Sequence, residues 1–370
     1  MSIFDIEIVL IAVVTAAACA LPGVFLVLRR NAMISDAISH TVLLGIVLGF
    51  FLVQDLSSPW LIIGAAATGV LTVSLTSLLE RTRLVKEDAA TGLVFPALFS
   101  IAVILITRYA GNVHLDTDAV LVGEIAFAPF DRFILGGLDL GPRGLWVMGV
   151  ILLVNLAFIT LFYKELKIST FDAGLAAALG FAPGLIHYAL MALVSITVVG
   201  AFDIVGSILV VALMVAPAIT AYLLTDRLAV MLALSVAIGA LSALLGYALA
   251  VLLDASIAGS MAAAAGILFG LVLLFAPERG LLAAARRRRL QRWEFAQTML
   301  AIHLMNHEDS PQGDVENRVD HLHEHLRWDP DFTERVLQRA ENHAWVARRP
   351  SGRLELTEEG RRHAKKVVTT

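Results

Sequence analysis

The feature that most constrains this 370-residue sequence is a series of apolar runs, each long enough to cross a lipid bilayer. A membrane-spanning helix needs about 20 consecutive apolar residues. The two runs nearest to each other are separated only by Asp203 and the glycines around it. We therefore predict an all-α polytopic membrane protein with about nine transmembrane helices, at residues 6–28, 33–53, 60–79, 89–107, 145–163, 186–202, 205–224, 228–253 and 257–276.

Charged residues are concentrated at the C-terminal end of the chain. The whole sequence is 58% hydrophobic and 16% charged, whereas soluble domains are about 25% charged. Residues 278–370 nevertheless hold 17 of the 28 Lys and Arg and 15 of the 32 Asp and Glu. This change predicts two domains, a transmembrane domain at 1–280 and a soluble domain at 281–370. The soluble part has almost balanced charge, so we do not expect nucleic acid as a partner.

The basic residues predict the orientation of the spans. Lys and Arg near span ends accumulate on the cytoplasmic side of a membrane. With nine spans and the N-terminus outside, the basic clusters fall on one side: Arg29–Arg30, Arg81–Lys86, Lys164 with Lys167, and Arg286–Arg289. The C-terminal domain is then predicted to be cytoplasmic. The single cysteine, Cys19, excludes a disulfide or a cysteine-based zinc site within one chain.

Two polar side chains at the start of the second predicted span form a candidate metal site. A charged residue at membrane depth is costly and often marks a transport pathway. Asp36 and His40 are spaced i, i+4, which places them on one face of a helix. A carboxylate and an imidazole are half of a ligand set for a first-row divalent metal such as manganese. The alternatives are that Asp36 caps the helix and that His40 hydrogen-bonds a neighbouring span.

A second group of candidate ligands lies in the predicted outer loop and beside it. These residues suggest a surface where a metal arrives from outside: His114, Asp116, Asp118, Glu124 and Asp203. An ordinary solvated acidic loop is the alternative for the first four, and a turn residue at the outer surface is the alternative for Asp203. Residues 125–143 are too short and too broken to span, and residues 164–183 suit a short amphipathic helix at the inner surface or a plain connecting loop.

Four strings in order along the chain resemble the permease subunits of the manganese/zinc/iron chelate uptake family of ABC transporters. They are SDAISHTVLLG (35–45), NVHLDTDAVLVGEI (112–125), KELKISTFDAGLAAALG (164–180) and DIVGSILVVALMVAPAITA (203–221). The resemblance covers about residues 5–280. It implies a permease subunit that is not an enzyme and holds no permanently bound cofactor, because a separate partner hydrolyses ATP. No Walker A pattern occurs in the chain.

The resemblance also implies partners, location and site residues. The expected partners are cytoplasmic ABC ATPase subunits, an extracytoplasmic metal-binding protein and a second permease chain, identical or related, in the bacterial cytoplasmic (inner) membrane. The family's intramembrane metal site corresponds to Asp36 and His40. The segment that docks into the ATPase corresponds to Phe171, Asp172, Ala177, Leu179 and Gly180. Manganese is the favoured substrate, with zinc or ferrous iron as alternatives.

The C-terminal domain has the element order of a winged helix. Its pattern reads helix–helix–helix–hairpin–helix, and LELTEEGRRHA (354–364) resembles iron- and manganese-dependent repressors. His321, His323 and His325 are candidate regulatory metal ligands, and a histidine-rich surface helix is the alternative. We favour a regulatory or ATPase-contacting role for this domain. Two other functions stay open, a membrane-anchored metal-sensing regulator and a secondary transporter without an ATPase.

Overall fold

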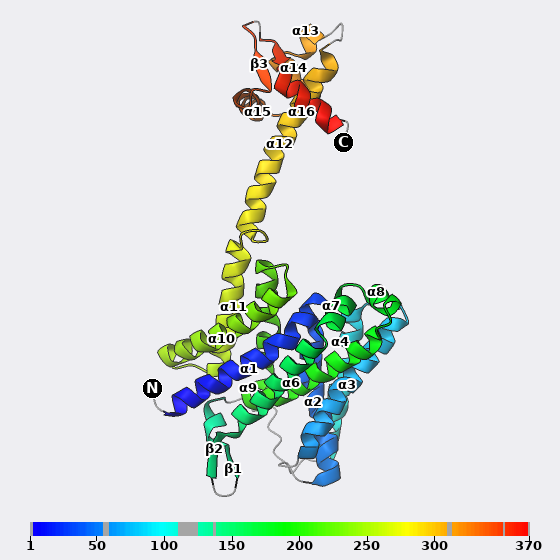
Figure 1. The fold of residues 1–370 in the computed structure, drawn as a ribbon, viewed down its shortest axis with the longest axis vertical. Coiled ribbons are helices and arrows are strands. Elements are labelled where there is room, and N and C mark those ends of the chain that lie inside the picture. The colour runs from blue at the N-terminus through cyan, green and yellow to red at the C-terminus, as the bar shows by residue number, and fades with distance from the viewer. Residues whose placement is uncertain are drawn as a thin grey trace. The chain divides into compact units, whose positions relative to one another are not determined.

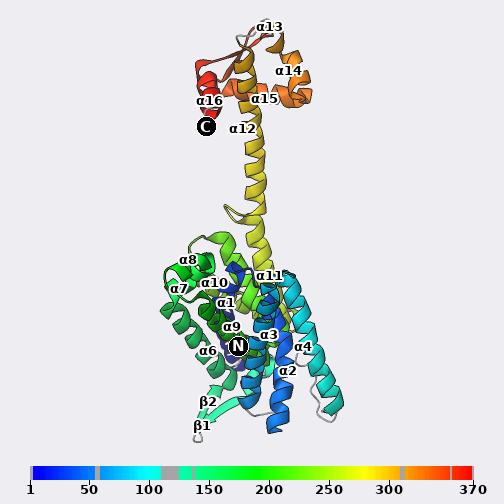
Figure 2. The same cartoon turned by 90° about the vertical axis from the view of Figure 1, so that its right-hand side faces the viewer.

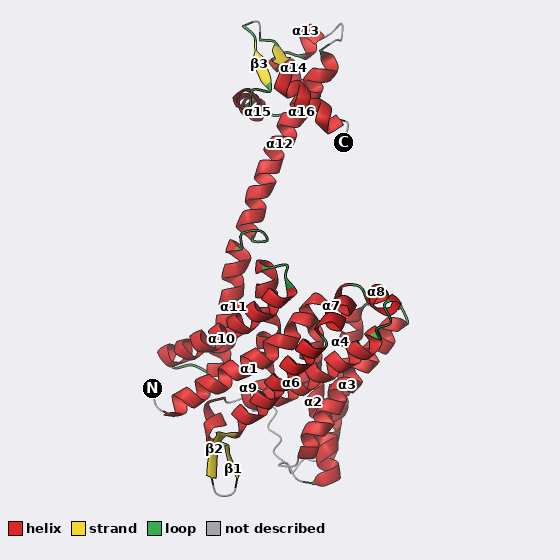
Figure 3. Ribbon diagram, viewed as in Figure 1, coloured by secondary structure: helices red, strands yellow, loops and turns green. Residues whose placement is uncertain are grey.

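The computed structural model describes residues 3–54, 59–109, 125–135, 138–308, 313–350 and 352–368. The chain divides into two compact units, Met1–Gly280 and Leu281–Thr370 (Figure 1). Both are predominantly helical, and each holds one small two-stranded sheet (Figure 3).

The first unit contains long apolar helices whose lengths suit a membrane. Eight helices among the described residues are long and apolar enough to cross one: α1 (Ile3–Leu28), α2 (Met33–Val53), α3 (Pro59–Arg81), α4 (Glu87–Tyr109), α6 (Arg143–Leu161), α9 (Pro183–Leu224), α10 (Leu228–Leu253) and α11 (Ile257–Phe275). The predicted runs at 186–202 and 205–224 both lie in α9, which has 42 residues. No loop divides the runs, but α9 consists of two helices joined at a kink, so the prediction of two helices with a break between them is confirmed and only the position of the break differs.

The backbone of α9 nevertheless breaks at Gly206, where φ is 77° and ψ is 166°. Before the break, Ile204 lies against Gly144 at the start of α6. After it, Met214 packs on Gly23, near the end of α1. Because α1 and α6 begin side by side, these contacts mean that the chain reverses direction within α9.

The contacts of α1 and α6 place their starting ends together. Arg132, shortly before α6, pairs with Glu7 in the second turn of α1. Deeper in the unit, the side-chain amide of Asn155 donates to the carbonyl oxygen of Ala18 at 2.9 Å. Helix α1 is thus the buried centre of the unit and packs against α6, α9 and α10 (Figure 2).

Helix α2 is held closely between α3 and α4. Its Gly45 lies so near Gly64 of α3 that a Cβ atom on either residue would collide with the backbone of the other. The Thr72 hydroxyl of α3 donates to the Thr41 hydroxyl at 2.8 Å, in a buried contact. These contacts fix which face of α2 is buried.

The segments between the long helices form short elements. Residues 125–143 do not span, as predicted. They form a 3-10 helix, η1 (Ile125–Phe130), and an antiparallel hairpin of β1 (Arg132–Leu135) and β2 (Leu138–Pro142), so the expected all-α class is wrong for this segment. Residues 164–183 are helical, but they form two short helices, α7 (Tyr163–Phe171) and α8 (Ala173–Ala178).

The second unit closes a small hydrophobic core of its own. Its elements are α12 (Leu281–His307), α13 (Gly313–Glu316), α14 (Val319–Leu326), α15 (Pro330–Asn342), β3 (Val346–Arg348), β4 (Leu354–Leu356) and α16 (Glu358–Val368). Strands β3 and β4 pair antiparallel, with Val346 opposite Leu356. Leu300, Leu322 and Leu337 are fully buried in the core. The unit therefore has the size and packing of a separate small domain.

Candidate metal and coupling sites

Asp36 and His40 face each other on the first turns of α2. The His40 Nε2 atom lies 3.6 Å from the Asp36 Oδ1 atom, as the i, i+4 spacing predicts. Their side chains are 38% and 31% exposed, whereas neighbouring Ile38 is fully buried. The pair therefore lies on the face of α2 that the chain itself leaves open.

The surroundings of the pair explain its orientation. The His40 ring lies against Phe95 and Phe99 of α4, with ring centroids 5.6 and 6.1 Å away. The hydroxyls of Ser35 and Ser39 are turned back onto backbone carbonyl oxygens of their own segment, so they are not oriented as ligands. The helix begins after Ala32, whose side chain makes no capping bond. Asp36 pairs with His40 rather than capping α2.

This pair alone would give a metal two ligands. Among the described residues, no three His, Cys, Asp or Glu side chains gather closely enough to hold a metal ion. A carboxylate oxygen and an imidazole nitrogen can bind a divalent metal weakly, and further ligands would have to come from elsewhere.

The corner formed by α7 and α8 is an exposed surface with apolar side chains. Phe171 is 63% and Leu179 is 57% exposed. Asp172 ends α7 and caps α8, because its Oδ1 atom accepts the Leu175 N–H at 2.8 Å. Gly180 takes a left-handed φ of 87° after α8. The corner thus has a defined backbone that presents apolar side chains and Ala177 to solvent.

Arg29, in the connection between α1 and α2, holds this corner in place. Its guanidinium donates to the hydroxyls of Ser169 and Thr170 at the end of α7, each at 3.1 Å. It also lies 3.2 Å from the His187 Nδ1 atom in the first turns of α9. The sequence assigned Arg29 only a role in orientation, because partners more than 100 residues away cannot be read from local spacing.

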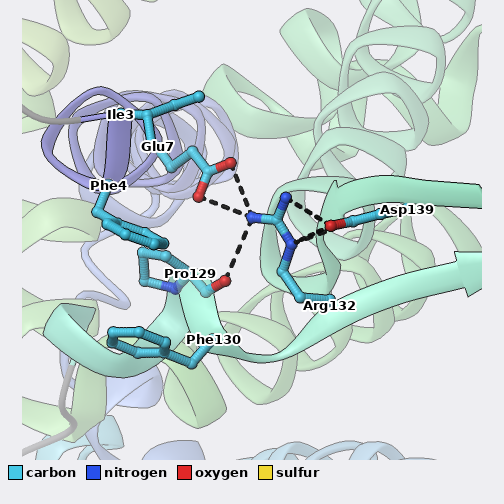
Figure 4. A pocket seen from close by; sticks show the side chains of 7 residues that line it. All are labelled: Ile3, Phe4, Glu7, Pro129, Phe130, Arg132 and Asp139. Carbon is cyan, nitrogen blue, oxygen red and sulfur yellow. Dashed lines mark hydrogen bonds and ion pairs between the residues drawn. The ribbon is translucent and has the colours of Figure 1, made fainter.

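The pocket in Figure 4 lies at the start of α1, beside η1 and the β1–β2 hairpin, and has a volume of about 340 Å³. Arg132 occupies one side of it, donating to both carboxylate oxygens of Glu7 and to Asp139. Hydrogen bonds with Arg132 and with the Gly141 N–H lower the pKa of the Asp139 carboxyl. Arg132 already pairs with both Glu7 and Asp139. These ion pairs hold the hairpin against α1, so we do not interpret the pocket as a metal site.

Most of the predicted metal-arrival residues lie outside the described part of the chain: His114, Asp116, Asp118 and Glu124. Asp203 is described. It is exposed on α9, three residues before the break at Gly206 and at the same end of the unit as the hairpin.

A family model matches most of the chain. The model is the ABC 3 transport family, and it matches residues 4–276. The chain belongs to the ABC 3 transport family. Its members are permeases rather than enzymes, so the predictions of a transport permease and of a multi-pass membrane protein are confirmed.

Two family relatives differ in how much of the chain they match. The zinc transport system membrane protein TroD of Treponema pallidum is 50% identical over 342 residues, which cover 92% of this chain and 93% of TroD. The manganese transport system membrane protein MntD of Bacillus subtilis is 47% identical over 284 residues, which cover 77% of this chain and 96% of MntD. MntD thus has almost no length left for a counterpart of the second unit.

A solved structure of the same kind supports the fold. PsaBC from Streptococcus pneumoniae, in complex with a Fab, matches with a TM-score of 0.63 and 29% identity. The match covers 75% of the present chain and 94% of the PsaBC chain.

The second unit of the present chain contains the predicted regulatory histidines. His321, His323 and His325 lie on α14, and only the His321 side chain is among those described; it is partly exposed. A second pair of histidines, not among the predicted ligands, lies on α12: the rings of His303 and His307 are 4.6 Å apart. The His307 Nδ1 atom contacts the Glu316 carboxylate. Their i, i+4 spacing was the available signal.

Proposed function

We propose that this chain is the membrane-spanning permease subunit of an ATP-driven importer of a divalent metal, with manganese as the substrate. The observation that carries the proposal is the Asp36–His40 pair, held on the open face of α2 in a chain of the ABC 3 transport family. A passing ion needs ligands that bind it well enough to admit it and weakly enough to release it. A two-ligand contribution from one chain suits that requirement.

The choice of manganese rests on the chemistry of the two ligands and on the relatives. Oxygen and nitrogen donors suit manganese, and neither residue offers the thiolate that softer metals prefer. MntD is named for manganese, whereas TroD, which covers more of the chain, is named for zinc. Zinc or ferrous iron is therefore the alternative substrate of the same kind of transporter.

A second permease chain, identical or related, would complete the metal site. Two copies of the pair would supply four ligands around one path. The exposed corner at Phe171, Asp172, Ala177, Leu179 and Gly180 would receive a cytoplasmic ABC ATPase subunit. At the hairpin end, an extracytoplasmic metal-binding protein would deliver the ion near Asp203.

The reversal at Gly206 supports nine crossings rather than eight. If both halves of α9 cross the bacterial cytoplasmic membrane, the N-terminus lies outside and α11 ends inside. That arrangement places Arg29, Lys164, Lys167 and the Arg286–Arg289 run on the cytoplasmic side.

The second unit would then be a cytoplasmic winged-helix domain. Helices α12, α14 and α15, the hairpin β3–β4 and α16 follow the order of that fold. Its absence from the MntD match favours a regulatory or ATPase-contacting role over a role in transport itself. His321, His323 and His325 are candidate ligands for a regulatory metal.

The proposal is tested by reconstituting the chain with its ATPase and partner permease chain in liposomes and measuring manganese uptake. We expect uptake that needs ATP and that excess zinc or ferrous iron reduces only weakly. Uptake that zinc or ferrous iron abolishes would change the substrate. Failure of the chain to co-purify with any ATPase would support a secondary transporter instead.

A further inference from the structure

The short connection between α1 and α2 joins the two regions on which the proposed function depends. It consists of residues 29–32 and is held by backbone hydrogen bonds to both helices. The Asn31 N–H donates to the Leu26 carbonyl at the end of α1, and the Ile34 N–H of α2 donates to the Asn31 carbonyl. The Asp36–His40 pair begins four residues after this connection. A shift of the connection therefore moves the first turns of α2 directly.

Arg29 fastens this connection to the exposed corner. Its guanidinium donates to Ser169 and Thr170, the last residues of α7 before Phe171, and meets His187 of α9. A guanidinium offers several N–H donors in one rigid plane, whereas a lysine ammonium is a flexible point charge. Three partners on two elements thus hold Arg29 in one position, so movement of α7 is passed on through it.

We propose that Arg29 is the positioning residue that couples the α7–α8 corner to the metal pair. Displacement of the corner by a bound ATPase pulls the guanidinium, and with it the residue 29–32 connection and the start of α2. His187 moves with it at the start of α9, which packs on α2 and α3. This inference rests on the proposed function, because it needs an ATPase at the corner and a metal at the pair.

The test compares variants in the reconstituted complex by the ratio of metal taken up to ATP hydrolysed. Arg29→Ala should lower that ratio about tenfold while ATP hydrolysis continues. Arg29→Lys should give an intermediate ratio, because lysine keeps the positive charge but lacks the planar set of N–H donors of the guanidinium. The paired change of Ser169→Ala with Thr170→Val should act like Arg29→Ala, because it removes the acceptors on α7.

Lys167→Ala is the matched control. Lys167 lies exposed on α7, so its loss removes one positive charge at the same end without touching the Arg29 contacts. We expect its ratio to equal that of the wild type. The inference is overturned if Arg29→Ala leaves the ratio unchanged, or if uptake, hydrolysis and the yield of complex fall together, as a purely structural residue would cause. Absence of ATP-driven uptake in the wild type would instead refute the proposed function, and the inference with it.

Discussion

The two units of this protein differ in what their cores do. In Met1–Gly280 the larger apolar core surrounds α1, a smaller one joins α2 and α4, and the partly exposed Asp36–His40 pair carries the proposed transport function. In Leu281–Thr370 a small core closes beneath a charged surface, as in a soluble domain. MntD matches almost its whole length without the second unit, whereas TroD matches most of both. The first unit therefore corresponds to a whole relative that is named for transport, whereas the second unit has no counterpart of similar length in MntD.

Removing the charge of Asp36, a residue of the first unit, should lower metal uptake more than any of the following changes. Asp36→Asn keeps the size of the side chain but replaces a carboxylate oxygen with an amide, which is a weaker metal ligand. We expect metal uptake to fall by more than about tenfold. Uptake by reconstituted complex, normalised to the amount of protein, measures the effect.

The matched control for Asp36→Asn is Asp254→Asn. Asp254 ends α10 with a left-handed φ of 51°, a conformation that asparagine also adopts readily. This variant should transport like the wild type. Equal uptake by both variants and the wild type would leave the metal pair without a role, and the two units would then no longer differ in the way described.

The reversal of α9 gives the second-largest effect, on folding of the first unit. Gly206 has φ 77° and ψ 166°, a region of backbone geometry that is essentially reserved for glycine. Gly206→Ala should cost about 1–3 kcal/mol of folding free energy. The yield of folded protein after detergent extraction and its thermal midpoint would report the loss.

Gly266→Ala serves as the control for the backbone effect. Gly266 lies inside α11 with open space where a Cβ atom would sit, so alanine should be neutral or slightly stabilising. If Gly206→Ala were as stable as Gly266→Ala, the break in α9 would not be needed for folding. In either variant we expect the second unit, which has a core of its own, to stay folded.

Sequence reasoning identified the spans because their signal is local. Length and apolarity of a run suffice to predict a spanning helix, and the spacing of Asp36 and His40 correctly predicted their contact. Their role as a metal site stays a prediction. The hairpin at 132–142 also had a local signal that was not used, since Gly136–Gly137 separates two short apolar runs in the manner of a tight turn.

What sequence reasoning missed depends on tertiary contacts. Asp203 and the glycines around it correctly suggested a break between two helices, but the sequence did not show that the break lies at Gly206 or that the chain reverses direction there. Arg29 reaches partners 140 to 158 residues away, and nothing in the local pattern distinguishes it from Arg30. Such contacts become visible only once the helices are packed.

Deleting residues 290–370 should change regulation more than transport. Because the first unit resembles a whole relative, the shortened chain should keep most of its uptake at saturating metal. If the second unit senses metal or contacts the ATPase, the dependence of uptake on metal concentration should shift. Uptake measured over a range of manganese concentrations tests this, and identical curves for both chains would remove the regulatory role.

Acidification should have the smallest effect, a local loss of stability in the two hairpins. Each unit contains one of these hairpins, so the same measurement compares them directly. A hydrogen bond from Arg349 lowers the pKa of Glu355 in β4, just as a hydrogen bond from Arg132 lowers the pKa of Asp139 in β2. A carboxyl group with a lowered pKa stabilises the fold above its unfolded value, about 4. That stabilisation is lost as the pH falls through the lower, folded-state value.

Both hairpins should therefore lose protection from amide hydrogen exchange below about pH 4. The loss at β1–β2 should extend to the start of α1, because Arg132 also holds Glu7, whereas the Arg349–Glu355 bond stays within its own hairpin. Asp139→Asn and Glu355→Gln remove the titrating groups, so each should lower protection at neutral pH and abolish the acid response of its own hairpin only. Acid responses that persist in both variants would show that other carboxyl groups govern these segments. A response that spreads from Glu355 into distant parts of the second unit would contradict the local clamp inferred there.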